Sequence, residues 1–352
     1  ASACTYGAML GASPRQIESA VGMFVAHHIP WRAIRAGKQL SDSKGASAAI
    51  STEAAIVCMQ RSMRGFVGPA DIFRNGEALF RQFEPTLDDS SSPFDLLLSR
   101  TGDDFAVMGM HFKLGIYEHQ SAGAIQAILN LLRNGCEDGI RGGGTAILED
   151  PVASIQSITV TAYEPAFSII GDPAKRDPKT RQSADHSMVF ILARVLVRAH
   201  QAYVNGRIGR SRAEEVWWEE TMLMPEDYGR SALECEMTRE LMRKIEFRHD
   251  PAYDASYPDG IPTSVTIETG SAGVMFDSGF VMHPGGHARC DGLDVDRILK
   301  QKAFAFASLG VEGGDEEVER VLSRLRGIED LAPEEMCSLY DFRLKDGLAI
   351  DE

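Results

Sequence analysis

Basic residues gather in one segment of a chain that is otherwise acidic. Residues 31–44 read WRAIRAGKQLSDSK. Against the single acid Asp42, this segment holds four cations: Arg32, Arg35, Lys38 and Lys44. Lys44 stands directly before a predicted helix, whose free N–H groups and dipole also favour anions. The segment could therefore bind the carboxylates of a substrate, although a solvated basic loop has the same composition.

A second segment places a lysine near an acid–histidine pair. Residues 110–124 read MHFKLGIYEHQSAGA. Lys113 stands between two apolar residues, where partial desolvation would suit it to anion binding or proton transfer. Glu118 and His119 precede a helix start rich in small residues, and an imidazole there can act as a general acid or base. Each residue could equally be a structural hydrogen-bonding group.

Two further segments carry histidines. In residues 176–189, RDPKTRQSADHSMV, Asp185 and His186 stand at the start of an apolar helix, and a cap with a carbonyl-bonded imidazole is the expected structural role. Residues 283–289 read HPGGHAR and offer His287 and Arg289 beside two glycines. Those glycines would let the backbone approach a ligand closely, but a tight turn needs the same residues.

Composition narrows the classes of partner. The 352 residues carry 36 Lys and Arg against 51 Asp and Glu, a net charge of −15, which repels phosphate backbones and argues against nucleic-acid binding. No apolar run approaches the ~20 residues of a membrane span. The six cysteines are scattered and include no CxxC, so their spacing matches neither a zinc site nor an iron–sulfur site. We expect reduced cysteines in an intracellular protein that takes a small-molecule ligand.

The hydrophobic periodicity predicts an α+β fold in which a helical domain receives a smaller α+β insertion. Apolar spacing of three and four predicts helices over residues 14–28, 46–64, 121–133, 184–202, 293–306 and 316–325. Alternation predicts strands over residues 155–163, 263–269 and 273–282, the last two joined by a hairpin turn at 270–272. Residues 85–99 and the glycine run 142–144 are expected to be loops.

Three of these stretches, taken in order, resemble the MmgE/PrpD family, and within it most closely the eukaryotic, fungal-like 2-methylcitrate dehydratases. They are GMHFKLGIYEHQSAGA, DPKTRQSADHSMVFILA and VMHPGGHAR. The resemblance covers essentially the whole chain. It implies a cofactor-free lyase with a large all-helical domain over residues 1–108 and 292–352, and an inserted α+β lid over residues 109–291.

The activity implied by the resemblance is dehydration of 2-methylcitrate to 2-methyl-cis-aconitate, a step of propionate catabolism. This β-elimination needs a base, an acid and cations that hold the developing enediolate charge. On that pattern, the catalytic residues are His119, Lys44, Lys113 and Glu118. The substrate-binding residues are Arg35, His287 and Arg289, and no metal is expected.

The resemblance also leaves alternatives open. Family members have a long helical N-terminal region with an Asp/Thr segment and catalytic histidines, whereas this chain begins at Ala1, after that region. The chain could therefore be a fragment that acts as a binding or dimerisation module. Within the family, cis-aconitate decarboxylases and an epimerase act on related polycarboxylates. A homodimer in the mitochondrial matrix, with a small tricarboxylate as ligand, is implied by resemblance alone.

Overall fold

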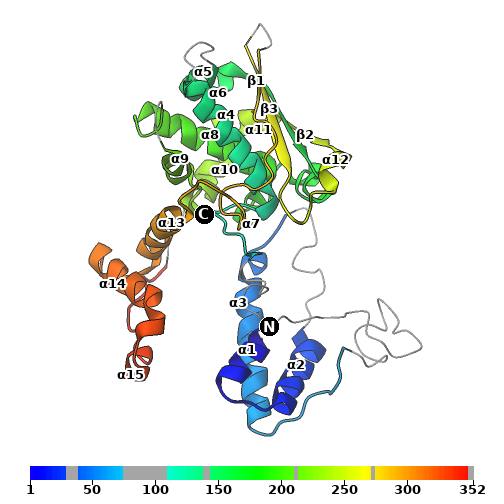
Figure 1. The fold of residues 1–352 in the computed structure, drawn as a ribbon, viewed down its shortest axis with the longest axis vertical. Helices are drawn as coiled ribbons and strands as arrows, with labels where there is room; N and C mark the ends of the chain where they lie inside the picture. The colour runs from blue at the N-terminus through cyan, green and yellow to red at the C-terminus, as the bar shows by residue number, and fades with distance from the viewer. Residues whose placement is uncertain (29–38, 74–108, 138–142, 210–212, 271–273, 348–352) are drawn as a thin grey trace, which may run out of the picture. The chain divides into compact units, whose positions relative to one another are not determined.

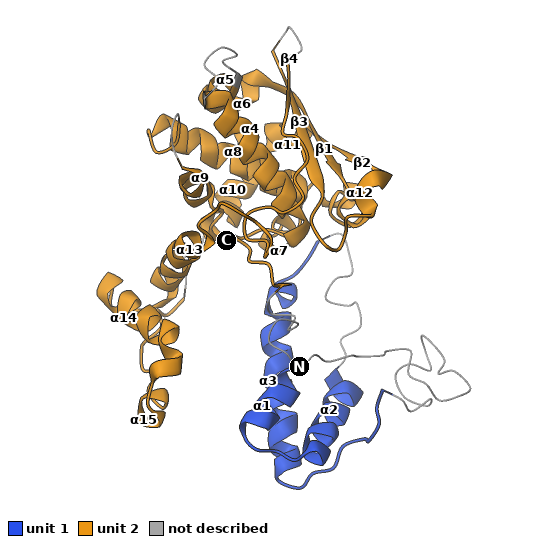
Figure 2. Cartoon of the chain, viewed as in Figure 1, with its two compact units in different colours: residues 1–105 blue, residues 106–352 orange. Residues whose placement is uncertain are grey.

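The computed structural model describes residues 1–28, 39–73, 109–137, 143–209, 213–270 and 274–347 (Figure 1). The chain divides into two compact units, Ala1–Phe105 and Ala106–Glu352 (Figure 2). Each unit is described by itself below. The predicted loop over residues 85–99 lies outside the described residues.

The described part of the first unit is helical, with α1 (Ser2–Met9), α2 (Pro14–His28) and α3 (Ser43–Met63). Helix α2 has the predicted bounds. It begins with a capping box, because the Gln16 side chain accepts from the Ser13 backbone N–H at 2.8 Å and the Ser13 hydroxyl accepts from the Gln16 N–H at 3.3 Å. Its buried face packs on α3 through a small core of Ala20, Met23, Cys58 and Met59.

The second unit contains a mixed four-stranded sheet with strand order β2-β1-β3-β4. Strands β1 (Ile155–Ala162) and β3 (Thr263–Thr269) pair antiparallel where alternation predicted strands. Strand β4 (Val274–Asp277) pairs antiparallel with β3 but ends five residues before the predicted end, and residues 271–272 of the predicted turn lie outside the described residues. Strand β2 (Ile245–His249), which pairs parallel with β1, was not predicted.

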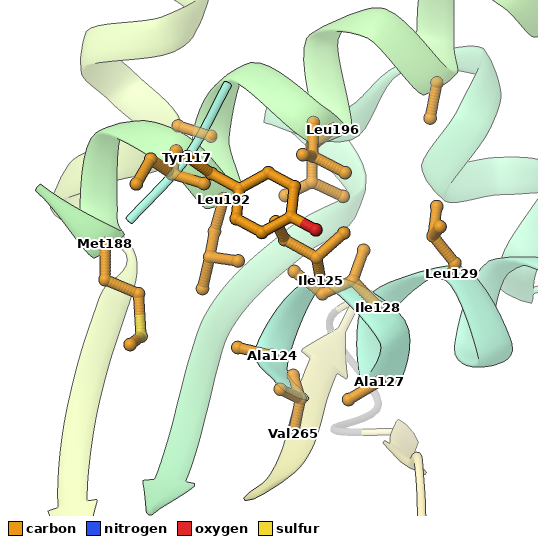
Figure 3. Packing of buried hydrophobic residues seen from close by; sticks show 14 of the residues in the cluster. Tyr117, Ala124, Ile125, Ala127, Ile128, Leu129, Met188, Leu192, Leu196 and Val265 are labelled. Carbon is orange, nitrogen blue, oxygen red and sulfur yellow. The ribbon is translucent and has the colours of Figure 1, made fainter. Parts of the chain in front are cut away.

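Two long helices lie beside this sheet, of which the first packs on strand β3 and the second packs on the first (Figure 1). They are α4 (Ala122–Glu137) and α8 (Met188–Val204). Sheet side chains such as Val265 are buried beneath them, and the Tyr117 ring packs among Ile125 of α4 and Leu192 of α8 (Figure 3). Most of the unit's buried apolar residues belong to this one cluster. The cluster forms a rigid support for the segments of the candidate site.

Shorter helices surround this core, and the last three helices of the chain form the C-terminal part. They are α5 (Gly143–Glu149), α6 (Pro151–Ser154), α7 (Arg181–Ala184), α9 (Glu214–Thr221), α10 (Arg230–Glu234), α11 (Glu236–Arg243), α12 (Pro251–Asp254), α13 (Val295–Gly310), α14 (Asp315–Arg326) and α15 (Pro333–Met336). The protein is therefore of mixed helix and sheet. None of the helices in the described ranges is long and apolar enough to cross a membrane.

The glycine run 142–144 was predicted to be a loop, and this is wrong for Gly143 and Gly144, while Gly142 lies outside the described residues. Gly143 and Gly144 open α5, and the absence of a side chain at Gly144 lets the backbone lie against α4. A Cβ on Gly144 would stand 2.6 Å from the carbonyl carbon of Gly135. Close helix contact, and not chain flexibility, therefore explains glycine here.

Residues 292–352 fall in the second unit of this division, with residues 106–291. The expected boundaries at 108 and 291, and the return of the C-terminal part to the helical domain, stay predictions.

Candidate active site

The site is built on two segments that are joined through their backbones. The Phe112 N–H donates to the Gly286 carbonyl at 2.7 Å, which ties the segment before α4 to the turn after β4. Gly286 has φ +86°, and a Cβ there would lie 2.0 Å from the Phe112 carbonyl oxygen. Only glycine therefore allows this contact.

A buried glutamine fixes the same turn to two helices. The Gln126 side-chain oxygen, on α4, accepts from the Gly285 N–H at 2.9 Å and from the Trp218 indole N–H at 3.2 Å. Its amide nitrogen donates to Glu214 of α9 at 2.8 Å. Gln126 is 5% exposed, so these bonds are shielded from water and hold the histidines of the turn in place.

The segment 114–118 is anchored on the other side by tyrosines. The Tyr117 hydroxyl accepts from the Leu114 N–H at 2.8 Å, and the buried Tyr228 hydroxyl donates to the Ile116 carbonyl. The Ile116 N–H donates to the Leu223 carbonyl at 3.0 Å. Lys113, Glu118 and His119 are therefore carried by a stretch that is fixed at several backbone groups.

Four histidine rings lie in a row where these segments meet. The His111 Nδ1 and His119 Nε2 atoms are 3.3 Å apart. The ring centroids of His111 and His287 are 3.8 Å apart, and those of His287 and His283 are 4.5 Å apart. Of the four, only His119 and His287 were predicted as site residues.

Burial favours the neutral form of three of these imidazoles. It is the main cause that lowers the pKa of His111, His119 and His287. The other imidazoles and nearby cations lower these pKa values further, and the pKa of His287 falls to about 4, with the Asp259 backbone acting against the shift. The His287 Nδ1 accepts from the Arg289 N–H at 3.0 Å, so the neutral ring carries its proton on Nε2.

Cations flank the histidine row. Lys113 and Arg289 are exposed, and their charges contribute to the lowered pKa values of His119 and His111 respectively. Lys302 of α13 donates from Nζ to the Lys113 carbonyl. Burial, and then the charge of Lys113, lowers the pKa of Lys302. Two exposed cations thus stand beside neutral imidazoles, an arrangement suited to a carboxylate ligand.

Glu118 is the acidic group of the site. Its carboxylate caps the 3₁₀ turn His119–Ser121 by accepting from the Gln120 N–H at 3.1 Å. Burial raises the pKa of Glu118, although that hydrogen bond and the charges of His186, Lys175 and Lys113 act against the increase. The raised pKa shifts Glu118 toward the protonated form, which can donate a proton.

The segment with Asp185 and His186 also reaches Glu118, since His186 and Lys175 act on the pKa of its carboxyl group. Asp185 was predicted to cap α8, and this is wrong. The cap is Ser187, whose hydroxyl accepts from the Phe190 N–H at 3.4 Å. Asp185 instead bonds the His186 imidazole, whose Nδ1 also lies 3.0 Å from the Gln182 carbonyl oxygen. The carbonyl partner expected for His186 is thus present.

The predicted site residues fall into three groups. His119, Lys113, Glu118, His287 and Arg289 come together in the second unit. Lys44 lies in the first unit, inside the first turn of α3 and not before the helix as expected, with its N–H donating to the Ser41 carbonyl at 3.0 Å. Its convergence with His119 stays a prediction. Arg35 lies outside the described residues.

Sequence reasoning missed His111, His283 and Lys302. His111 and His283 stand within the quoted motifs, but the ring contact that joins the two motifs, between His111 and His287, spans 287 − 111 = 176 positions of the chain. The one local signal is the repeated pairing of histidines, at spacing eight in residues 111–119 and at spacing four in residues 283–287. Lys302 had no signal, because a lysine in an amphipathic helix normally faces water.

The arrangement can do acid–base chemistry on an anion: neutral His119 can accept a proton, Glu118 can donate one, and Lys113 and Arg289 can hold charge. Among the described residues, no group of three or more His, Cys, Asp or Glu side chains has the geometry of a metal site.

Neither a protein-family model nor a curated protein matches the chain.

Proposed function

We propose that the protein is a lyase that dehydrates 2-methylcitrate to 2-methyl-cis-aconitate. One observation carries the proposal: the three stretches that resemble the MmgE/PrpD family meet around Glu118 and His119. A base, an acid and two cations lie there together, and a β-elimination of water from a polycarboxylate needs that set of groups.

In the proposed mechanism, the two cations bind substrate carboxylates and His119 removes the proton. Neutral His119 takes the proton from the carbon next to a carboxylate, and the C–H electron pair forms the new double bond. Lys113 and Arg289 stabilise the enediolate charge that develops on that carboxylate. Hydroxide leaves the adjacent carbon with a proton from Glu118, so that water is released. His287 supports the His111 ring, which in turn contacts His119.

The wider arrangement belongs to the same proposal. The helical first unit would belong to an all-helical domain of the MmgE/PrpD type, and the part around the sheet would be the inserted lid. The exposed apolar side chains of the first unit, Phe66 and Val67 among them, would suit burial in a homodimer. We expect the protein in the mitochondrial matrix, with a tricarboxylate as substrate and no cofactor.

Product analysis separates this function from the related alternatives. The purified chain is incubated separately with 2-methylcitrate, citrate and cis-aconitate, and the products are identified by mass spectrometry. The proposal expects loss of water from 2-methylcitrate. Loss of carbon dioxide from cis-aconitate alone would instead assign a decarboxylase, and no product from any of the three would contradict a lyase in this chain.

A further inference from the structure

A second cationic site lies in the second unit, apart from the histidine row. It is a pocket of about 530 Å³ between the loop that follows Lys175 and helix α11. Its lining residues are Arg176, Asp177, Lys179, Arg239, Met242 and Arg243. None of them belongs to the candidate active site, so an inference from this pocket does not depend on the proposed function.

The pocket is lined mainly by positive charges, whereas the chain as a whole is negative. Four cations face the single acid Asp177, which leaves a local charge of 4 − 1 = +3, whereas the whole chain carries −15. Asp177 is already shared, because Lys179 Nζ and Arg239 Nη1 both lie 2.8 Å from its Oδ1 atom. Asp177 is the one acid among the lining residues, so the lining of this pocket carries a net positive charge that favours an anion.

Neutral groups hold two of the arginines in position. Arg239 donates from Nε to the Leu233 carbonyl at 2.5 Å and from Nη2 to the Pro178 carbonyl at 3.0 Å. Arg176 donates to the Ile245 carbonyl at 2.9 Å, and its guanidinium lies 5.6 Å from the centre of the Phe247 ring. Carbonyl oxygens and a ring orient a guanidinium without cancelling its charge.

Arg243 completes the pocket from the last turn of α11. It is exposed, and none of the acids in the described ranges forms an ion pair with it. A cation at a helix C-terminus has a structural role, since it complements the helix dipole. That role does not account for three further cations around the same cavity.

We propose that this pocket binds a small polyanion, a molecule with at least two negative charges on phosphate or carboxylate groups. Its volume falls in the range of small-molecule sites, and guanidinium groups bind both kinds of oxyanion through paired hydrogen bonds. The ligand would supply the charge that Asp177 does not, and Met242 gives the pocket its apolar part.

Isothermal titration calorimetry of the full chain with pyrophosphate and with citrate tests the proposal. The variant Arg243→Glu reverses one charge of the pocket, and Arg248→Glu is the matched control, because Arg248 is an exposed arginine on β2 that does not line the pocket. Lys113→Ala separates the pocket from the candidate active site, where citrate could also bind. Comparing pyrophosphate with citrate shows whether phosphate or carboxylate is preferred.

We expect at least one of the two anions to bind the wild-type chain, and added potassium chloride to weaken that binding. Arg243→Glu should raise Kd by ~10-fold or more, the loss expected for a charged hydrogen bond. Arg248→Glu should change Kd by less than about 2-fold, and Lys113→Ala should leave this binding in place. The absence of binding in wild type, equal loss in the two arginine variants, or loss on Lys113→Ala would each overturn the proposal.

Discussion

At the scale of single residues, burial shifts the pKa values of the acid and the base of the candidate site. It lowers the pKa of His119, so the imidazole is neutral and can accept a proton. It raises the pKa of Glu118, so this carboxyl group is closer to a proton donor than an exposed glutamate would be. Two neighbouring residues are thus shifted toward opposite roles, which is a common feature of acid–base sites.

The division of roles between these neighbours predicts different effects on turnover. His119→Gln should lower kcat by ~10²–10⁴-fold and remove the acid-side limb of the pH–rate profile, because the base must be neutral to act. Glu118→Gln should remove the limb at higher pH, where the acid loses its proton. Steady-state kinetics across pH would measure both limbs. If Glu118→Gln removed the limb assigned to His119, the roles would be reversed.

The lowered pKa of His287 also predicts how stability varies with pH. The folded-state pKa is about 4, below the ordinary value of 6.5, so between these values the unfolded chain binds more protons than the folded one. The contribution of His287 to stability is therefore present above about pH 6.5 and is lost as pH falls toward 4. The loss is at most about 3 kcal/mol.

Urea unfolding across this pH window checks that prediction. His287→Asn keeps an acceptor near the position of Nδ1 and removes the titrating ring, so its stability should fall less steeply toward pH 4 than that of wild type. His27→Asn, which removes an exposed imidazole of α2, is the control and should follow the wild-type curve. Identical slopes for His287→Asn and wild type would contradict the pKa shift.

At the scale of elements, the site depends on the contact between Phe112 and Gly286. Gly286→Ala adds a Cβ that would lie 2.0 Å from the Phe112 carbonyl oxygen and also strains a residue at φ +86°. Gly292→Ala is a matched control, because Gly292 has the same φ of +86° with no atom near its Cβ position. The backbone strain alone costs about 1–2 kcal/mol.

We expect Gly286→Ala to destabilise the protein by about 1–3 kcal/mol more than Gly292→Ala, because the clash and the broken hydrogen bond add to the strain. Denaturant unfolding measures the difference. The same variant should lower activity, since the turn carries His283, His287 and Arg289. Equal stability loss in the two alanine variants would show that the backbone contact is not essential.

Local pattern predicted some elements well, while other elements depend on tertiary contacts. Helix α2 and strand β3 have the predicted bounds, because each shows a clear period of 3.6 or 2 together with a cap or turn signal. Strand β2 is five residues long and carries Glu246 and Arg248 on its exposed face, so its apolar signal is weak. Strand β2 is stabilised by its pairing with β1, which its own sequence does not indicate.

The candidate site was predictable to a similar extent. His119, Glu118 and Lys113 were found because they stand together in seven residues of an unusual segment. His111 contacts His287 only when the turn after β4 meets the segment before α4. No rule based on residue spacing predicts that contact, because it depends on Gly286 and on the buried Gln126.

At the scale of the whole molecule, the proposed mechanism predicts a contribution of the first unit to the site. The residues that come together around His119 all belong to the second unit, whereas Lys44 belongs to the first. Lys44→Ala should raise KM or lower kcat by a loss of about 1.5–3 kcal/mol, the strength of a hydrogen bond to a charged group.

Stability serves as the control for Lys44→Ala. Lys44 is half-buried in the first turn of α3, where a cation is not favoured by the helix dipole, so the melting temperature should not fall. Lys44→Arg should keep most of the activity. A loss of melting temperature that accounts for the loss of activity would make Lys44 a structural residue and remove it from the mechanism.

The most direct test of the proposed function follows the conjugated alkene product by its ultraviolet absorbance when 2-methylcitrate is added. Wild type, His119→Gln and Lys113→Ala are measured side by side at matched concentration, with folding checked by circular dichroism. We predict time-dependent alkene formation by wild type, and a fall of ~10²-fold or more in His119→Gln. No turnover by wild type, or turnover that persists unchanged in His119→Gln, would contradict the account.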